Sequence, residues 1–201
     1  MGLTFENPDG ATPLDLDEAG ALIPSLSTQA ELNEFEFLNI AEAIDWAERS
    51  RKIKADLLRP DTLRLLHKRM FGRTWRWAGQ YRTTQKSIGV EAFRISTELL
   101  NLTEDVKCWL EFGSYPRGEI AARFHHRLVV IHPFPNGNGR HARLATDLLC
   151  ERERWPRSLW GAAEGVEPGE VRSRYLDSLR QADRHDLSAL ISFMGIDPAP
   201  G

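Results

Sequence analysis

The chain has 201 residues, of which 41% are hydrophobic and 27% are charged, and its formal net charge at pH 7 is −3. This length and balance are typical of one soluble globular domain with a sizeable core. The small net charge argues against a general nucleic-acid-binding protein, which usually carries a strongly basic face. Two cysteines are too few for a disulfide framework, and no apolar run approaches the roughly 18 residues that a membrane span requires. We therefore expect a cytoplasmic protein that does not enter the membrane.

The chain divides into an N-terminal segment, residues 1–26, and a single domain over residues 27–201. The first segment contains three prolines, which is typical of loops and short extended pieces. Ser27 can cap the first helix of the domain, which we expect to extend to about residue 54 because apolar residues recur at intervals of three and four. A second helix is predicted to begin at Pro60, a residue suited to the first turn.

After this helix the sequence changes character. Residues 72–81 are aromatic and bounded by glycines, which indicates a packed loop. Residues 82–95 combine strand-forming residues around Gly89, and we predict a small β-hairpin there, which we call the flap. Helical periodicity returns afterwards and continues to the C-terminal region. The further helices are predicted over residues 96–112, 120–131, 139–152 and, as one or two helices, 171–194. The expected fold class is all-α with a small β-hairpin.

The most informative segment is residues 132–143, which read HPFPNGNGRHAR. Gly137 and Gly139 each lower helix propensity by roughly 1 kcal/mol relative to alanine, but they let a ligand approach the backbone closely. A helix follows from Arg140, so several backbone N–H groups point the same way at a helix N-terminus. Such an N-terminus favours an anion.

Charged side chains beside this loop extend the same interpretation. Arg140 and Arg143 lie one turn apart on the same face of the expected helix, and guanidinium groups make planar contacts to phosphate oxygens. The imidazole of His132 can accept a proton from a hydroxyl nucleophile, and Phe134 is expected to anchor the loop. Taken singly, these features are typical of a turn, a solvated face and a structural histidine. Together they favour a polyphosphate site beside a base.

The segment resembles the signature of the Fic (filamentation induced by cAMP) family, His-x-Phe-x-(Asp/Glu)-Gly-Asn-Gly-Arg-x-x-Arg. The matching residues are His132, Phe134, Gly137, Asn138, Gly139, Arg140 and Arg143. The helix before the motif, the flap and the segment around Tyr175 also resemble the family, so the resemblance covers roughly residues 27–194. The stretches ELNEFEFLNI and TWRWAGQYRTTQKSIG are similar to a bacterial subgroup called mobile mystery protein B.

The resemblance implies a nucleotidyltransferase that moves AMP from ATP to a Ser, Thr or Tyr hydroxyl of a target protein or of itself. It implies that His132 deprotonates the hydroxyl and that Arg140 and Arg143 bind the outer phosphates during catalysis. The implied nucleotide-binding residues are Asn136, Gly137, Asn138, Gly139, Arg140, Arg143 and Tyr175. Tyr175 has two open interpretations, stacking on the adenine and packing in the core.

The flap is the implied docking site for the target protein, whose backbone it would align by strand addition. The implied docking residues are Thr83, Thr84, Ile88 and Gly89. The expected partners are therefore a nucleotide such as ATP and a protein with a hydroxyl side chain. The oligomeric state, a homo-oligomer included, is left open by the sequence.

Asn136 departs from the signature, because the family has an acidic residue there that ligates Mg²⁺. The neutral carbonyl oxygen of asparagine is a weaker ligand for this hard cation, although phosphates and water fill most of its shell. Three interpretations follow: weak AMP transfer, an altered donor or reaction, and a nucleotide-binding or regulatory module without catalysis.

The helix over residues 27–54 resembles an inhibitory element of the family, (Ser/Thr)-x-x-x-Glu-(Gly/Asn). Ser27 and Glu31 match this pattern, and Leu32 departs from it. The resemblance implies that Glu31 pairs with Arg143 and blocks the γ-phosphate. A capping serine and a glutamate at a helix N-terminus explain the same residues equally well.

Overall fold

The computed structural model describes residues 13–161 and 167–196, and in these residues the fold is all-α. The helices are α1 (Leu16–Ala19), α2 (Gln29–Arg49), α3 (Arg51–Ala55), α4 (Pro60–Phe71), α5 (Ile95–Phe112), α6 (Arg117–Ile131), α7 (Asn138–Arg152), α8 (Pro168–Ala182) and α9 (Ser188–Met194), with a 3-10 helix at Ala92–Arg94 before α5. Among these described helices, none combines the length and apolar character that crossing a bilayer would require.

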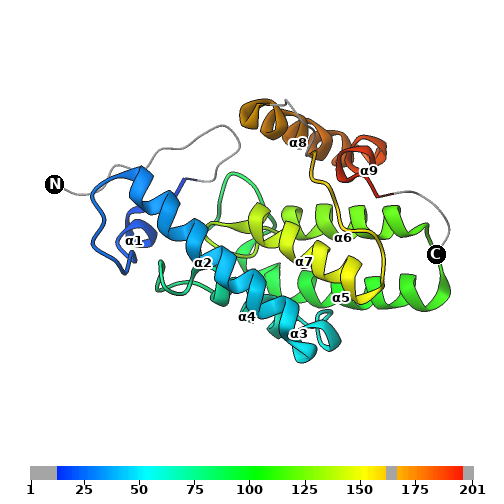
Figure 1. The fold of residues 1–201 in the computed structure, drawn as a ribbon, viewed down its shortest axis with the longest axis horizontal. Coiled ribbons are helices and arrows are strands. Elements are labelled where there is room, and N and C mark those ends of the chain that lie inside the picture. The colour runs from blue at the N-terminus through cyan, green and yellow to red at the C-terminus, as the bar shows by residue number, and fades with distance from the viewer. Residues whose placement is uncertain (1–12, 162–166, 197–201) are drawn as a thin grey trace.

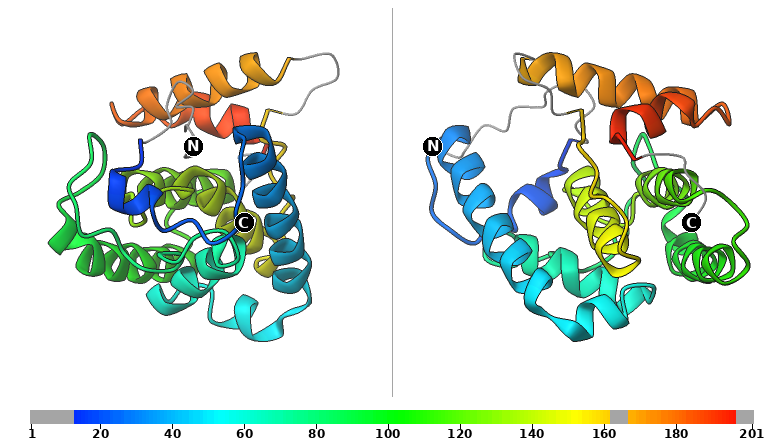
Figure 2. Two further views of the ribbon diagram at one scale, coloured as in Figure 1. Left: turned by 90° about the vertical axis from the view of Figure 1, so that its left-hand side faces the viewer. Right: turned by 45° about the vertical axis from the view of Figure 1, so that its right-hand side comes forward.

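Helices α6 and α7 pack against each other at the centre of the fold (Figure 1). Helix α5 packs on α6, α2 packs on α4, and α4 also contacts α7. Helices α8 and α9 pair with each other, and α9 contacts α6, so that both lie together above the remaining helices in the views of Figure 2. The loop between α6 and α7 carries the signature residues, and it is therefore held at both ends by the central helices.

The inward face of α7 shows why this region is firmly placed. Ala142, Ala145 and Leu149, which the sequence predicts to face the core, are completely buried. Leu148 joins them. Burial of a side chain as large as leucine stabilises a fold by about 1.5–3 kcal/mol, so α7 is fixed by its packing and its N-terminus is held in one place.

The predicted first helix is interrupted. Helix α2 ends at Arg49, and Ser50 is extended and caps α3, its hydroxyl accepting the N–H of Ile53 at 3.3 Å. At the other end of α2 the capping residue is Thr28 and not Ser27. The hydroxyls of Ser50 and Thr28 accept backbone N–H groups three residues further along the chain. Such local hydrogen bonds begin a helix at the next residue and account for both differences.

The predicted β-hairpin is wrong for this structure. Residues 81–91 form an irregular loop, and within the described residues the β pairing is limited to an isolated bridge between Leu22 and Trp75. The guanidinium of Arg82 explains the difference, because it donates hydrogen bonds to the carbonyls of Thr84 and Val90 on the two arms of the loop. Such carbonyls would be the acceptors in a hairpin ladder. We keep the name flap for residues 82–90.

The predicted N-terminal loop contains the short helix α1, although its first twelve residues lie outside the described part of the chain. Asp15 and Glu18 form a capping box that closes this single turn. Backbone hydrogen bonds at Ala21 and Ile23 then attach the segment to the loop that follows α4. Helix α1 is therefore fixed to the body of the domain.

Candidate active site

His132 ends α6 in a left-handed conformation, with φ 51° and ψ 59°. Its side chain is buried beneath the flap, because a Cβ built on Gly89 would lie 2.8 Å from the Cβ of His132. The backbone at Gly89 has φ +102°, which side chains other than glycine rarely adopt. The flap therefore packs closely over His132 at a point where only glycine fits.

The charge state of His132 follows from its surroundings. Burial, and then the nearby charge of Arg82, lower the pKa of His132 from 6.5 to about 4. The Nε atom of Arg82 also donates a hydrogen bond of 2.7 Å to the backbone carbonyl of His132. At neutral pH the imidazole is uncharged, as a group that accepts a proton must be. Arg82, which binds the carbonyls of the flap, therefore also binds the backbone of His132.

The loop after His132 is closed by Asn138. Its side-chain oxygen accepts the N–H of Phe134 at 2.9 Å, and its side-chain nitrogen donates to the carbonyl of Phe134 at 2.8 Å. Phe134 is completely buried and stacks on His67 with 3.7 Å between ring centroids. The predicted anchoring role of Phe134 is confirmed. The side chain of Asn138 holds the loop closed by binding the backbone of Phe134.

Gly137 begins α7 and has φ +78°. A Cβ at this position would lie 2.6 Å from the ring of Phe71, so the backbone approaches that ring closely. The residue has no side chain with which to cap α7, and the first amides of a helix that lacks such a cap can bind an anion. The side-chain oxygen of Asn136 accepts the N–H of Gly137 at 2.6 Å, so Asn136 is folded back onto the loop.

Arg140 pairs with a carboxylate that the sequence analysis did not single out. Its Nη1 lies 2.6 Å from Oε2 of Glu36 on α2, and the other oxygen of Glu36 accepts the indole N–H of Trp75 at 2.7 Å. Glu36 is only 7% exposed. In the sequence, Glu36 could have been noticed because it falls on the apolar stripe of α2. A glutamate buried there requires a partner of opposite charge.

Arg143, one turn further along α7, lies over the ring of Tyr175 with 5.3 Å between its Cζ atom and the ring centroid. Burial lowers the pKa of its guanidinium, and the positive charge of Arg140 acts in the same direction. No carboxylate of the described residues forms an ion pair with it within 4 Å. The negative charge of Asp147 acts in the opposite direction on this pKa, although the two side chains form no ion pair. A partly buried cation without a direct ion pair favours an anionic ligand.

Residues 57–150, which contain His132, the loop and both arginines, match the Fic/DOC family. The chain carries a Fic/DOC domain. The protein adenylyltransferase fic-1 of Caenorhabditis elegans is 31% identical over 183 residues, which cover 88% of this chain and 34% of that protein. The protein adenylyltransferase Fic of Nematostella vectensis is 28% identical over 168 residues, covering 81% and 38%. The chain spans about a third of the length of these relatives.

Solved structures share the fold. Residues 134–508 of C. elegans Fic-1 superimpose with a TM-score of 0.63 at 28% identity, covering 89% of this chain and 52% of that one. The Bartonella tribocorum effector BepC, solved with bound AMPPNP, gives a TM-score of 0.69 at 16% identity, covering 90% and 96%. At that identity the likeness to BepC shows the fold alone.

Tyr175, which lies beyond the residues that match the family, is beneath Arg143 and is 8% exposed. Its hydroxyl is 2.9 Å from Nε2 of His125, and its ring also contacts Phe193. This placement favours packing in the core over stacking on an adenine. The tyrosine ring also makes a cation–π contact with Arg143.

The carboxylate of Glu31 is exposed at the N-terminus of α2. It accepts the N–H groups of Ser27 at 2.7 Å and Thr28 at 3.1 Å, and these hydrogen bonds lower the pKa of Glu31. The capping interpretation accounts for this geometry without Arg143.

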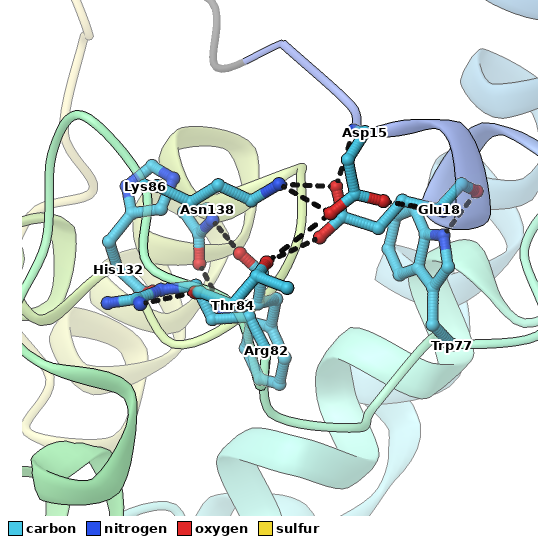
Figure 3. A network of polar contacts seen from close by, with 9 residues as sticks. Asp15, Glu18, Trp77, Arg82, Thr84, Lys86, His132 and Asn138 are labelled. Atoms are coloured by element: carbon cyan, nitrogen blue, oxygen red, sulfur yellow. Dashed lines mark hydrogen bonds and ion pairs between the residues drawn. The ribbon is translucent and has the colours of Figure 1, made fainter.

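The flap residues of the Fic/DOC domain lie on the outside of the irregular loop. Thr83, Thr84, Ile88 and Gly89 are all exposed, and the hydroxyl of Thr84 faces the carboxylates of α1 (Figure 3). These residues are placed where a partner could reach them.

The donor set for Mg²⁺ is small. Among the described residues no group of three or more His, Cys, Asp and Glu side chains is arranged to hold a metal ion. Asn136 is the residue of this loop that the resemblance implies as the Mg²⁺ ligand, and its side-chain oxygen is engaged by the N–H of Gly137. To hold a magnesium ion it would have to share or leave that hydrogen bond, with phosphates and water as the other ligands.

Proposed function

We propose that this Fic/DOC domain is a nucleotidyltransferase that moves AMP from ATP to a Ser, Thr or Tyr hydroxyl of a target protein or of itself. The observation that carries the proposal is the placement of the buried His132 at the end of α6, just before the N-terminus of α7, which has no side-chain cap, with Arg140 and Arg143 on the first turns of α7. The relation to protein adenylyltransferases supports it. We keep the resemblance to the mobile mystery protein B subgroup as a proposal that rests on sequence.

In this mechanism the hydroxyl oxygen attacks the α-phosphorus, the bond to the bridging oxygen of the β-phosphate breaks, and pyrophosphate leaves. His132 takes the proton of the hydroxyl and later releases it to solvent. A pKa of about 4 makes His132 a weak base before ATP binds. Bound phosphates would offset the charge of Arg82 and raise this pKa, and the loose transition state of phosphoryl transfer requires positioning more than strong base catalysis.

The phosphates would lie at the amides of Asn138 and Gly139, where the dipole of α7 favours negative charge. The amide of Gly137 would join them once a phosphate displaces the side-chain oxygen of Asn136 from it. Arg143 and Arg140 would bind the outer phosphates and stabilise the charge that develops on pyrophosphate. Bound Mg²⁺ would neutralise further charge on the phosphates, with Asn136 as its ligand from the protein.

The arginine pair also suggests how the site is restrained. Arg140 is engaged by Glu36, so a phosphate must displace or share that carboxylate. We propose Glu36 as a carboxylate of α2 that competes with the nucleotide. The inhibitory role that the resemblance implies for Glu31 also stays a proposal, in which Glu31 would leave its capping position to reach Arg143.

A second function, a nucleotide-binding or regulatory module without catalysis, is favoured by one observation. The position of the family's acidic metal ligand is occupied by Asn136, whose oxygen is already bonded to Gly137. Such a module would bind ATP with the same loop and arginines but would transfer nothing.

Incubation with ATP labelled at the α-phosphate separates the two functions. The purified protein is tested alone and with a cell lysate, beside His132→Ala and the matched control His185→Asn, which changes an exposed histidine. We expect protein-bound label in the wild type and the control, and none in His132→Ala. Binding of ATP without label in any sample would support the regulatory module, and absence of ATP binding would exclude both.

A further inference from the structure

The flap is a loop whose shape depends on side-chain contacts. Residues 82–90 contain no helix or strand, so their conformation is held by what packs against them. On the inner side Arg82 binds the carbonyls of Thr84 and Val90 and the backbone of His132. On the outer side the flap meets α1.

The contact with α1 centres on Lys86. Its side chain is 8% exposed, and its ammonium lies 2.5 Å from Oε2 of Glu18 and 3.5 Å from Oδ2 of Asp15. Figure 3 shows Lys86 extending from the flap toward these two carboxylates. The hydroxyl of Thr84 lies 3.4 Å and 3.5 Å from the same pair. Lysine is seldom so buried without a partner, and removal of one partner leaves a charge without compensation.

Helix α1 can act as a support because other contacts hold it. The indole N–H of Trp77 donates to the carbonyl of Glu18 at 3.0 Å. The N–H of Ile23 donates to the carbonyl of Thr74 at 2.8 Å, and that of Arg76 to Ala21 at 3.0 Å. These bonds join α1 and its continuation to the loop after α4. The carboxylates of α1 are thus presented from a fixed position.

A displacement of the flap would reach His132 directly. The flap backbone at Gly89 is so close that a Cβ there would lie 2.8 Å from the Cβ of His132 and 2.6 Å from Nη2 of Arg82. The positive charge of Lys86 is also near enough to contribute to the lowered pKa of His132, after burial and Arg82. The same short loop therefore joins α1 on one side to His132 on the other.

We propose that Asp15 and Glu18 of α1 are positioning residues for the flap, holding it over His132 through Lys86 and Thr84. They lie outside residues 57–150, which match the Fic/DOC family. That α1 orders the flap stands on the contacts alone. That it thereby positions a target hydroxyl for His132 rests on the proposed function.

Cleavage of the unliganded full chain by thermolysin tests the ordering. This protease cuts before large apolar residues, and the flap offers Ile88 and Val90. Lys86→Met keeps the capping box of α1 intact, Glu18→Gln removes the partner charge, and Asp17→Asn removes an exposed charge from the same helix as the control. Since cleavage of a locally opened segment follows the population of the open state, we expect about tenfold faster cutting before Ile88 or Val90 in the first two variants and no change in the third.

The double variant Glu18→Gln/Lys86→Met should be cut no faster than the faster single variant, because both changes break the same contact. Unchanged cleavage in Lys86→Met, or additive effects in the double variant, would overturn the proposal. Thermal unfolding of each variant distinguishes local opening from a failure to fold, which would raise cleavage at sites throughout the chain.

The link to catalysis is tested with the labelled-ATP reaction. In Glu18→Gln the rate at which label is transferred to the chain itself or to lysate protein should fall at least several-fold, while the calorimetric affinity for ATP stays the same. A higher transfer rate in the variant would show that α1 is a cover that must leave, which overturns the positioning role. If the wild type transfers no label, the proposed function fails, and the cleavage rates still decide whether α1 orders the flap.

Discussion

Replacing Glu36 with glutamine should increase the affinity of the domain for ATP, because Arg140 would lose the carboxylate that competes with phosphate. The two residues are joined by a contact of 2.6 Å, with the side chain of Glu36 buried and the side chain of Arg140 36% exposed. Hydrogen bonds to charged groups contribute about 1.5–3 kcal/mol, and the exposure of Arg140 argues for the low end of that range. Since 1.4 kcal/mol corresponds to a factor of ten, ATP should bind about tenfold more tightly.

Glutamine is the informative substitution here. It keeps the volume of the side chain and an oxygen that can accept the indole N–H of Trp75, which Glu36 binds at 2.7 Å. The comparison variant is Glu31→Gln, which removes a charge from the same helix at an exposed capping position. If Glu31 acts only as a helix cap, ATP affinity should change less than about twofold in this variant; if Glu31 reaches Arg143, the affinity should rise.

Isothermal titration calorimetry with ATP measures both variants against the wild type. Equal affinity in Glu36→Gln and the wild type would refute competition between Glu36 and phosphate. A gain in Glu31→Gln alone would show that the carboxylate implied by the resemblance, and not Glu36, restrains the site in solution.

Three further predictions concern the same loop and its surroundings. Asn136→Asp should lower the magnesium concentration at which label transfer is half-maximal, because a carboxylate adds charge to the metal shell; identical titration midpoints would contradict this. Tyr175→Leu should weaken ATP binding several-fold while Tyr175→Phe retains it, because a cation–π contact with Arg143 is worth about 0.5–2 kcal/mol; equal loss in both variants would count against the ring. The free energy of unfolding should fall as pH is lowered from 6.5 toward 4, as urea denaturation can measure, and a constant value over that range would exclude the neutral buried histidines.

The direction of the pH effect follows from proton uptake. Burial lowers the pKa of His125 to about 3 and of His132 and His141 to about 4, and that of His67 lies well below 6.5. Below pH 6.5 the unfolded chain therefore binds protons that the folded chain does not, so stability is lost as pH falls. Burial raises the pKa of Asp147 from 3.8 to about 6, which acts in the opposite direction. The four histidines outnumber this single carboxylate, so the net effect is a loss of stability as pH falls, and each net proton taken up on unfolding contributes about 1.4 kcal/mol per pH unit.

Much of the helical framework could be predicted from local patterns. Pro60 marks the start of α4, and the inward positions of α7 follow from periodicity, as the burial of Ala142 and Leu149 confirms. The signature loop was also recognisable, because the positive φ of Gly137 and the hydrogen bonds between Asn138 and Phe134 are local features. In these cases the information lies within a few residues of the feature that it determines.

Features that depend on contacts between distant residues could not be predicted from local sequence patterns. Residues 82–95 have strand-forming side chains. The guanidinium of Arg82, however, binds the carbonyl of His132, fifty positions away, and the flap forms an irregular loop in place of a hairpin. Glu36 was visible only as a polar residue in an apolar stripe, with its partner Arg140 on another helix. The docking of α1 likewise depends on Lys86, far along the chain.

We propose that the N-terminus of α7, with Arg143 and Arg140, binds a chain of phosphates. Calorimetric affinities of ATP, ADP and AMP, measured for the wild type and for Arg143→Gln, examine this site. Affinity should fall stepwise as phosphates are removed, and Arg143→Gln should abolish most of the advantage of ATP over AMP. Equal affinities for the three nucleotides, or a variant that still prefers ATP as strongly as the wild type, would contradict the proposal.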